Sequence, residues 1–368
     1  MHYSKIKGAS PSLLGMGAMR LPQVGEGWGK PVDYGPAQEM IDYCVLQGVN
    51  YFDTAYVYHG GDSERFLGKA LSKYPRDSYY LANKYNILAQ PDYRAQFEEQ
   101  LERLQTDYVD FYMPHGISDN FISGYLGNGC VEYFLEEKAK GRIKRLGFSF
   151  HGKPDVLRQA LSYCEWDFAM IQLNYYDWFH GITSELYGIL KENNIPILAM
   201  EPVHGGMLAS LTGEGNAMLR GSKPDRSIAS WAIRFVLGLP EVAVVLSGMS
   251  SLDQVKDNIA TVKERQPLSA DDKALLLEAS ALLYKSIGAP CTLCRYCNCP
   301  QGLDIPYILT LYNDYKTGGE WRLKRLFAFP PEHRPEACTG CKACVTQCPQ
   351  NLDMPKFMAE IAEVMKGL

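Results

Sequence analysis

Short apolar segments alternate with longer segments of mixed polarity up to about residue 265. Eight of the short segments have the length and composition of buried strands. They are LLGMGAM near residue 15, YFDTA, YYLANK, YVDFYM, LGFSF, MIQLNY, IPILAM and VAVVLSG. Between them, segments such as PDYRAQFEEQLERLQ, which begins at Pro91, place Phe97, Leu101 and Leu104 on one face of a helix.

The alternation favours one α/β architecture. Eight strand and helix repeats over about 265 residues match the size of a (β/α)8 TIM barrel. The alternative is a doubly wound open sheet, which places a glycine-rich phosphate turn after its first strand. The segment GMGAMR lacks the third glycine of that turn. We therefore predict a barrel over residues 1–285 and a separate small domain over residues 286–368.

Composition narrows the class of protein. The 368 residues are 46% hydrophobic and 21% charged, with a net charge of −5, as in ordinary globular proteins. No stripe of Lys and Arg suggests nucleic-acid binding, and no apolar run reaches the length of a membrane span. The segment MHYSKIKGASPS lacks the apolar core of a signal peptide. We expect a cytoplasmic protein.

The cysteines are unevenly distributed. Of eleven, eight follow residue 290, whereas Cys44, Cys130 and Cys164 are isolated and are expected to be small core residues. Disulfides are rare in a reducing compartment. The eight clustered cysteines are therefore expected to bind metal.

Two cysteine runs carry the eight thiols. The second, CTGCKACVTQCP, has the C-x2-C-x2-C-x3-C-P spacing of bacterial ferredoxins, which hold [4Fe–4S] clusters. The first, CTLCRYCNCP, is shorter by two residues before its last cysteine. The predicted ligands are Cys291, Cys294, Cys297, Cys299, Cys338, Cys341, Cys344 and Cys348.

A repeated segment suggests how the thiols are shared. CPQGLDIP begins at Cys299 and CPQNLDMP at Cys348, as in two halves of a double-cluster domain. In two-cluster ferredoxins the last cysteine of a run binds the other cluster. We therefore predict a crossed scheme in which Cys348 completes the first run and Cys299 the second. Two zinc sites are the alternative. The intervening segment, residues 307–327, has helical periodicity, so the domain is predicted to be a small α-helical ferredoxin-like one.

Four polar side chains fall at strand ends of the predicted barrel. Asp53 ends the second strand, with Tyr58 shortly after it, and Lys84 and His115 end the third and fourth. In a TIM barrel the carboxyl ends of the strands carry the chemistry. A buried Lys84–Asp53 pair beside Tyr58 would lower the phenol pKa from about 10 and make Tyr58 a usable proton donor.

At these positions the sequence resembles the aldo-keto reductases. The segment DTAYVYHGGDSERFLGKAL is similar to the family's second-strand signature, and GFSFHG, IQLNYY and LSGMSSLDQVKDNI resemble later motifs. The whole chain resembles the subgroup that carries a C-terminal ferredoxin-like domain with 4Fe-4S clusters. The resemblance implies that Tyr58 is the general acid, Lys84 and Asp53 tune it, and His115 orients a carbonyl.

The resemblance also implies a nicotinamide cofactor. Ser149 and Gln172 would hold the carboxamide, and Gly248, Ser250, Gln254 and Asn258 would line the adenosine end. The complete set of expected cofactor residues is Gly17, Ala18, Met19, Asp53, Ser149, Gln172, Met200, Gly248, Met249, Ser250, Gln254 and Asn258.

Two departures from the family pattern concern that cofactor. Met200 occupies the position of a stacking Tyr, and Gly248 and Gln254 replace the Lys and Arg that often bind the 2′-phosphate of NADP. Loss of these cations weakens a preference for NADP over NAD. The GMSSLDQ segment nevertheless resembles the potassium-channel β-subunit branch, which holds NADPH, so NADP is favoured.

Three functions follow from combining the two domains. The first is NAD(P)H-dependent reduction of a small carbonyl substrate to an alcohol, with structural clusters. In the second, the clusters transfer electrons between a redox protein partner and the barrel, through a flavin for which no motif is visible. In the third, the barrel is a nicotinamide-binding redox sensor or regulatory subunit. No nucleic-acid or membrane partner is expected.

Overall fold

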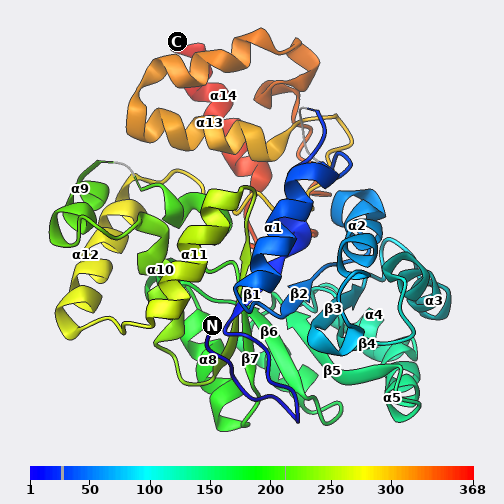
Figure 1. The fold of residues 1–368 in the computed structure, drawn as a ribbon. Coiled ribbons are helices and arrows are strands. Elements are labelled where there is room, and N and C mark those ends of the chain that lie inside the picture. Colours follow the sequence, from blue (N-terminus) through cyan, green and yellow to red (C-terminus); the bar gives the residue numbers. More distant parts are fainter. Residues whose placement is uncertain (26–28, 212) are drawn as a thin grey trace. The chain divides into compact units, whose positions relative to one another are not determined.

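Eight parallel strands close into a barrel in sequence order, with β8 paired to β1 (Figure 1). The computed structural model describes residues 1–25, 29–211 and 213–368. The strands are β1 Leu14–Gly17, β2 Tyr51–Asp53, β3 Tyr80–Tyr85, β4 Val109–Pro114, β5 Ile143–Phe150, β6 Phe168–Gln172, β7 Ile197–Met200 and β8 Val242–Gly248. The barrel prediction is confirmed, and the open-sheet alternative is wrong.

Helices connect successive strands. They are α1 Tyr34–Leu46, α2 Asp62–Leu71, α3 Tyr93–Leu104, α4 Ile122–Gly127, α5 Cys130–Ala139, α6 Pro154–Leu161, α7 Tyr175–His180, α8 Thr183–Glu192, α10 Ile228–Leu237 and α11 Leu252–Glu264, with the short 3-10 turns η1 Ala18–Arg20, η2 Tyr58–Gly61 and η3 Arg76–Ser78. Helix α3 begins two residues after Pro91 because the Asp92 side chain accepts hydrogen bonds from Arg94 N and Ala95 N. In the described ranges no helix is both long and apolar enough to cross a membrane.

Aromatic and aliphatic side chains fill the barrel interior. Tyr51, Phe111 and Phe168 belong to one buried cluster, with ring centroids of Tyr51 and Phe111 5.2 Å apart. An N-terminal hairpin, bridged between Ile6 and Ala9, contributes Ile6 to the same cluster. The interior is therefore packed, and chemistry is confined to the ends of the strands.

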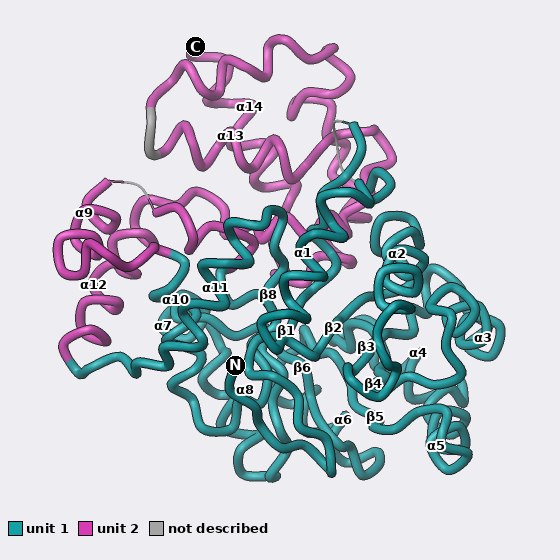
Figure 2. The backbone as a smooth tube through the Cα atoms, in the orientation of Figure 1, with its two compact units in different colours: residues 1–203, 229–270 teal, residues 204–228, 271–368 magenta. Residues whose placement is uncertain are grey.

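The chain forms two compact units (Figure 2). The first unit comprises residues 1–203 and 229–270, and the second comprises residues 204–228 and 271–368. This division differs from the expected boundary after residue 285, because residues 204–228 pack within the second unit. For example, Arg226 Nη1 lies 3.5 Å from Asp272 Oδ2.

The second unit is helical and has its own apolar core. Its elements are η4 His204–Ala209, α9 Gly213–Ser222, α12 Ala270–Ser286, α13 Ile305–Gly318, η5 Glu320–Ala328, η6 Pro331–His333, η7 Pro335–Ala337 and α14 Met354–Lys366. Leu309, Leu323 and Met358, from α13, η5 and α14, are fully buried in one cluster with Cys344. The small α-helical C-terminal domain is as predicted from the sequence.

Two segments differ from the predicted elements. The single helix predicted over residues 307–327 is divided between α13 and η5, because Gly319 adopts φ +97°, a backbone conformation that favours glycine. The segment MIQLNY is not a strand throughout. Asn174 caps α7 by accepting a hydrogen bond from Asp177 N, so Tyr175 begins a helix.

Candidate active site and cysteine clusters

Lys84 and Asp53 form a buried ion pair at the carboxyl ends of β3 and β2. Lys84 Nζ donates to Asp53 Oδ1 at 2.5 Å and to the Thr54 carbonyl oxygen at 2.7 Å. Both side chains are 2% exposed. Burial raises the pKa of Asp53 and lowers that of Lys84, and the mutual attraction of the pair opposes both shifts. The ammonium has three N–H groups, and the bonds to Asp53 and Thr54 use two of them.

Tyr58 and His115 complete the group of four expected residues. Lys84 Nζ lies 5.0 Å from the centroid of the Tyr58 ring, and the His115 ring lies 6.0 Å from that ring in an edge orientation. The four side chains therefore lie together in the first unit. A phenol beside an ammonium and an imidazole is suited to protonating an oxygen atom.

His115 is buried beside other basic groups. Burial, and then the charges of Lys84 and His151, hold the pKa of His115 well below its usual value. Burial also lowers the pKa of His151 to about 4. Both imidazoles are therefore neutral near pH 7, and a neutral His115 can donate one N–H hydrogen bond to a carbonyl oxygen. His151, which was not among the expected site residues, lies close enough to influence the pKa of His115.

The expected carboxamide residues are held by neighbouring groups. Ser149 Oγ accepts a hydrogen bond from Gly116 N at 2.7 Å, and Gln172 Nε2 donates to Asp177 Oδ2 at 2.6 Å. Met200, half-buried at the end of β7, packs against the barrel core.

The adenosine-end residues lie where β1 and β8 pair. Gly17 is opposite Gly248, and a Cβ on Gly248 would lie 3.4 Å from Cγ and Cδ of Arg20. The aliphatic stem of Arg20 therefore lies over Gly248. Arg20 follows the end of β1 by three residues and contacts the end of β8. Because this contact joins two strands that are far apart in the chain, the sequence alone did not predict it.

The other expected residues of this end make bonds within the chain. Gln254 Oε1 accepts from Ser250 N at 2.8 Å, and Asn258 Nδ2 donates to Ser247 Oγ at 3.0 Å. Met249 is buried. Ala18 accepts a hydrogen bond from Ser63 Oγ at its carbonyl oxygen, 3.2 Å away, which fixes the turn that carries Met19.

The aromatic segment at residues 175–179 packs against α10. The rings of Tyr175, Trp178 and Phe179 lie 6.3, 5.7 and 5.9 Å from the ring of Phe235. Tyr175 is fully buried. These contacts make the segment part of the packing between α7 and α10.

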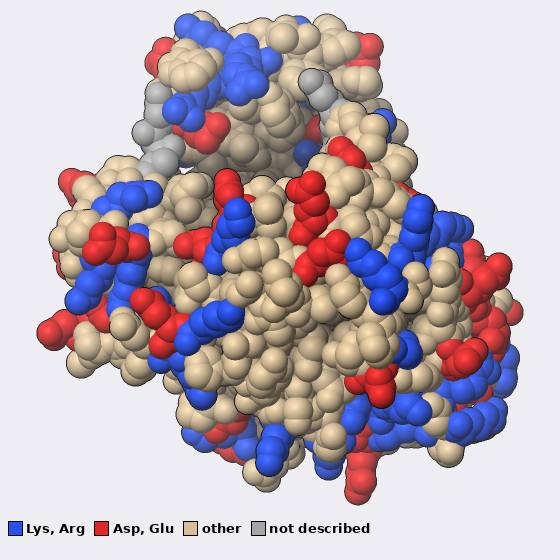
Figure 3. Space-filling model, in the orientation of Figure 1, with Lys and Arg blue, Asp and Glu red and all other residues tan. Residues whose placement is uncertain are grey.

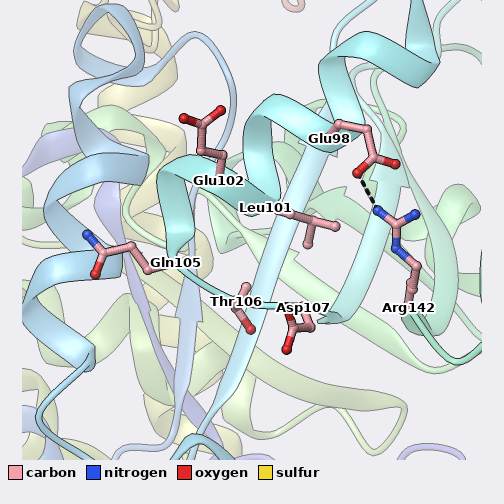
Figure 4. A pocket seen from close by; sticks show the side chains of 7 residues that line it. All are labelled: Glu98, Leu101, Glu102, Gln105, Thr106, Asp107 and Arg142. Carbon is pink, nitrogen blue, oxygen red and sulfur yellow. Dashed lines mark hydrogen bonds and ion pairs between the residues drawn. The ribbon is translucent and has the colours of Figure 1, made fainter.

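An open groove in the first unit lies away from the four residues (Figure 4). It occupies about 680 Å³ between the end of α3 and the segments that precede β4 and β5. Glu98 and Arg142 pair across it at 2.6 Å. Because it lies at the amino ends of the strands, it is on the side of a TIM barrel that serves stability instead of catalysis.

The cysteines of the second run share a cavity with the last cysteine of the first. Cys299, Cys338, Cys341 and Cys344 line one cavity together with apolar side chains such as Met354 and Met358. Four cysteines in the wall of one cavity match in number the ligands of a [4Fe–4S] cluster. The arrangement supports the crossed scheme, in which Cys299 serves the second run.

The first run is associated with Cys348. Burial raises the pKa of the Cys297 thiol to about 12, and the nearby Cys291, Cys348 and Cys344 thiols add to this rise. Cys291, Cys348 and Cys344 are therefore all near Cys297, which agrees with the crossed scheme without distinguishing Cys348 from Cys344. Within the described ranges no group of three or more His, Cys, Asp or Glu side chains is placed to hold one metal ion, a finding that does not separate zinc from iron.

A glycine lets the first cysteine run approach η4. A Cβ on Gly205, which has φ +65°, would lie 2.1 Å from the carbonyl oxygen of Thr292, next to Cys291. The adjoining Gly206, at φ +104°, has no atom within 4 Å of such a Cβ. A cavity of about 380 Å³ lies beside this contact and includes Cys291 in its wall. The backbone of the first run therefore depends on the absence of a side chain at residue 205.

Replacing Gly205 by Ala is expected to displace Thr292 and to release iron from the first run. Overpacking of this kind costs about 1–3 kcal/mol. Gly206→Ala is the matched control, because it carries a similar backbone strain without the contact. Iron per chain after desalting, together with the thermal midpoint, measures the effect. Equal losses in both variants would show that the contact with Thr292 is unimportant.

Family models match both parts of the chain. Residues 13–280 match the model described as the aldo/keto reductase family. Residues 331–352 match the 4Fe-4S binding domain, a range that includes Cys338, Cys341, Cys344 and Cys348. The first cysteine run lies outside that match.

Curated relatives extend over most of the barrel. An L-galactose dehydrogenase from Arabidopsis thaliana is 28% identical over 303 residues, covering 75% of this chain and 92% of the relative. An NADH-specific methylglyoxal reductase from Escherichia coli is 25% identical over 307 residues, covering 71% of this chain and 92% of the relative.

A solved structure extends the same similarity to three dimensions. The holo form of the aldo-keto reductase AKR11C1 from Bacillus halodurans superposes with a TM-score of 0.63 at 28% identity, covering 76% of this chain and 96% of that one. The family match spans well over half of the chain and includes all four residues of the buried site. The chain belongs to the aldo/keto reductase family.

Proposed function

We propose that this protein reduces a small aldehyde or ketone to an alcohol with a nicotinamide cofactor. The observation that carries the proposal is the buried Lys84–Asp53 pair beside Tyr58, with a neutral His115 facing the same ring. Family membership gives the class, oxidoreductase, and the geometry of the site supports carbonyl reduction as the reaction type. The relatives act on a sugar and on methylglyoxal by name, which supports a small polar carbonyl compound as substrate.

Each residue has a separate task in this reaction. A bound nicotinamide would supply hydride to the carbonyl carbon. Tyr58 donates its hydroxyl proton to the carbonyl oxygen, and the Lys84 ammonium stabilises the phenolate that remains. Asp53 keeps Lys84 charged and in place. His115 donates a hydrogen bond that orients the carbonyl, and Ser149 and Gln172 are available to hold the carboxamide.

The cofactor proposed is NADP(H), with NAD(H) as the alternative. Residues 248 and 254 lack a cation, and Arg20, whose stem lies over Gly248, is the proposed replacement. Loops after strands 7 and 8 of TIM barrels commonly bind phosphate. The relative from Escherichia coli is NADH-specific, so this preference needs a direct test.

Arg20→Gln is expected to weaken NADPH binding by about 10- to 100-fold, the value of one charge-assisted hydrogen bond. NADH binding should change little, because NADH lacks the 2′-phosphate. Titration of cofactor fluorescence gives both dissociation constants. Lys256→Gln on α11 is the control, because it also removes one positive charge. Lys256 is exposed, and its Nζ lies 4.0 Å from Asp253 Oδ1. If Arg20→Gln weakens the binding of NADPH and NADH equally, Arg20 contacts the pyrophosphate and not the 2′-phosphate.

For the second unit we propose two [4Fe–4S] clusters with crossed ligands. The cavity lined by Cys299, Cys338, Cys341 and Cys344 supports one of them. The clusters would hold the four-cysteine segments together, or they would transfer electrons. Iron, sulfide and flavin measured on one anaerobic sample separate these roles, because a one-electron cluster needs a flavin to exchange electrons with a two-electron hydride carrier.

A second candidate, electron transfer with a protein partner, is favoured by one surface. Lys and Arg gather over η5 on the face drawn in Figure 3. Lys324 and Arg325 are exposed there, next to Trp321 and Phe327, which are 62% and 42% exposed. Exposed aromatic rings among cations suit an acidic partner protein.

NADPH oxidation with an aldehyde panel, by the wild type and by Tyr58→Phe, decides whether reduction or a sensory role is primary.

A further inference from the structure

Glu64 is a fully buried carboxylate next to the site. It lies in the first turn of α2 and has no exposed surface. Its Oε1 accepts from Asn83 Nδ2 at 2.8 Å and from Gln100 Nε2 at 2.9 Å, and its Oε2 accepts from Arg103 Nη1 at 2.8 Å. A carboxylate that is removed from water needs such partners, because burial of an unpaired charge is strongly unfavourable.

Two of these partners hold the backbone of Lys84. Asn83 Oδ1 accepts from Lys84 N at 2.9 Å, and Gln100 Nε2 donates to the Lys84 carbonyl oxygen at 2.9 Å. Tyr112 Oη fixes the other end of the Gln100 amide by donating to its oxygen at 2.6 Å. Both backbone groups of Lys84 are therefore held by amides that Glu64 orients.

The same residue is tied to the segment that carries Tyr58. Helix α2 begins at Asp62, directly after η2, the turn that Tyr58 opens. Gly61 joins the two at φ +89°, a conformation that favours glycine. A displacement of Glu64 would therefore reach Tyr58 through the chain and Lys84 through the hydrogen bonds.

We infer that Glu64 is a positioning residue that sets the placement of Lys84 relative to Tyr58. The inference rests on the proposed reduction, in which Tyr58 donates a proton. The charge of Glu64 also acts directly, since it favours the protonated form of Lys84. Burial raises the pKa of Glu64, and the bonds from Arg103, Asn83 and Gln100 oppose that rise. Arg103 balances the carboxylate without contacting Lys84, and it also binds Glu99.

Glu64→Gln tests the inference because it keeps the size of the side chain and removes its charge. Tyr58 should then ionise at a pH higher by about one unit, since the ammonium beside it is less firmly held and less often charged. Ultraviolet difference titration of tyrosinate, with Tyr58→Phe as the background, reports this without any turnover. The value of kcat should fall roughly 10- to 100-fold, as for small displacements of catalytic groups, while the dissociation constant for NADP+ stays unchanged.

Glu99→Gln is the matched control. It removes one carboxylate from the same arginine but does not touch Asn83 or Gln100, so both titration and kcat should equal those of the wild type. If Glu64→Gln does not fold, Gln100→Leu removes the bond to the Lys84 carbonyl oxygen and should shift the Tyr58 titration in the same direction.

An unchanged tyrosinate titration in a folded Glu64→Gln variant would overturn the inference, as would an equal shift in Glu99→Gln. Failure of the proposed reduction has a different signature. In that case Tyr58→Phe would retain the wild-type rate of carbonyl reduction, whereas the tyrosinate titration would still report on Glu64.

Discussion

Tyr58→Phe is expected to lower kcat for carbonyl reduction by about 10²- to 10⁴-fold, the usual contribution of a positioned general acid. This corresponds to roughly 3–5 kcal/mol of transition-state stabilisation. The loss follows because Phe has no proton to give, and His115 is already neutral and only orients the carbonyl. The cofactor dissociation constant should not change, since Tyr58 acts on the substrate oxygen. Initial rates of NADPH oxidation with a small aldehyde measure the effect.

Tyr56→Phe is the matched control for this experiment. Tyr56 is two residues away, and its hydroxyl donates to Glu99 Oε2 at 2.8 Å, away from Lys84 and Asp53. Its removal should leave kcat within about twofold of the wild-type value, as for most substitutions away from the site. If Tyr58→Phe keeps more than about a tenth of the activity, the general acid is another group. An intact cellular effect without activity would favour the sensory alternative.

Pairs of cysteine substitutions should reveal the crossed scheme through iron content. If Cys348 belongs with the first run, the double variant Cys294→Ala/Cys348→Ala damages only one cluster and keeps about four irons. The variant Cys341→Ala/Cys348→Ala then damages both clusters and retains almost none. Each run serving its own cluster predicts the opposite order. Iron and acid-labile sulfide per chain, measured after anaerobic purification, distinguish the two arrangements.

Two further variants serve as a control and as a second test of the scheme. Cys164→Ala removes an isolated thiol outside both runs and should keep about eight irons. Cys299→Ala/Cys341→Ala should behave like Cys294→Ala/Cys348→Ala, because Cys299 and Cys341 line the same cavity. Zinc in place of iron in the wild-type protein would remove the basis of the scheme altogether.

The sequence located the groups at the strand ends because one rule of barrel architecture is sufficient for them. Asp53 and Lys84 end neighbouring strands, and the side chains at such ends face a common mouth. Their ion pair could therefore be predicted before any coordinates. The spacing of the second cysteine run likewise predicted a [4Fe–4S] binding segment, and the family match over residues 331–352 covers that run.

Other features were inaccessible because they depend on contacts between distant parts of the chain. Arg20 lies over Gly248 only when β1 meets β8, and Glu64 reaches Lys84 through Gln100, a residue of α3. The end of the helix at Gly319 was not predicted from the sequence for a different reason. Helical periodicity continues on both sides of it, and periodicity does not detect one residue with positive φ.

The discontinuous second unit affects the order in which the molecule can be completed during synthesis. Residues 204–228 leave the ribosome before β8, yet their partners in the second unit begin only at residue 271. Side chains that are buried in the complete molecule, such as Leu219, are therefore exposed to water during synthesis until the rest of the second unit has been made. The C-terminal segment is therefore needed to complete the packing of residues 204–228. A truncated chain that ends before Cys291 would keep its barrel strands but would leave η4 without the backbone of Thr292 that it packs against, and chaperones and proteases recognise such exposed surfaces.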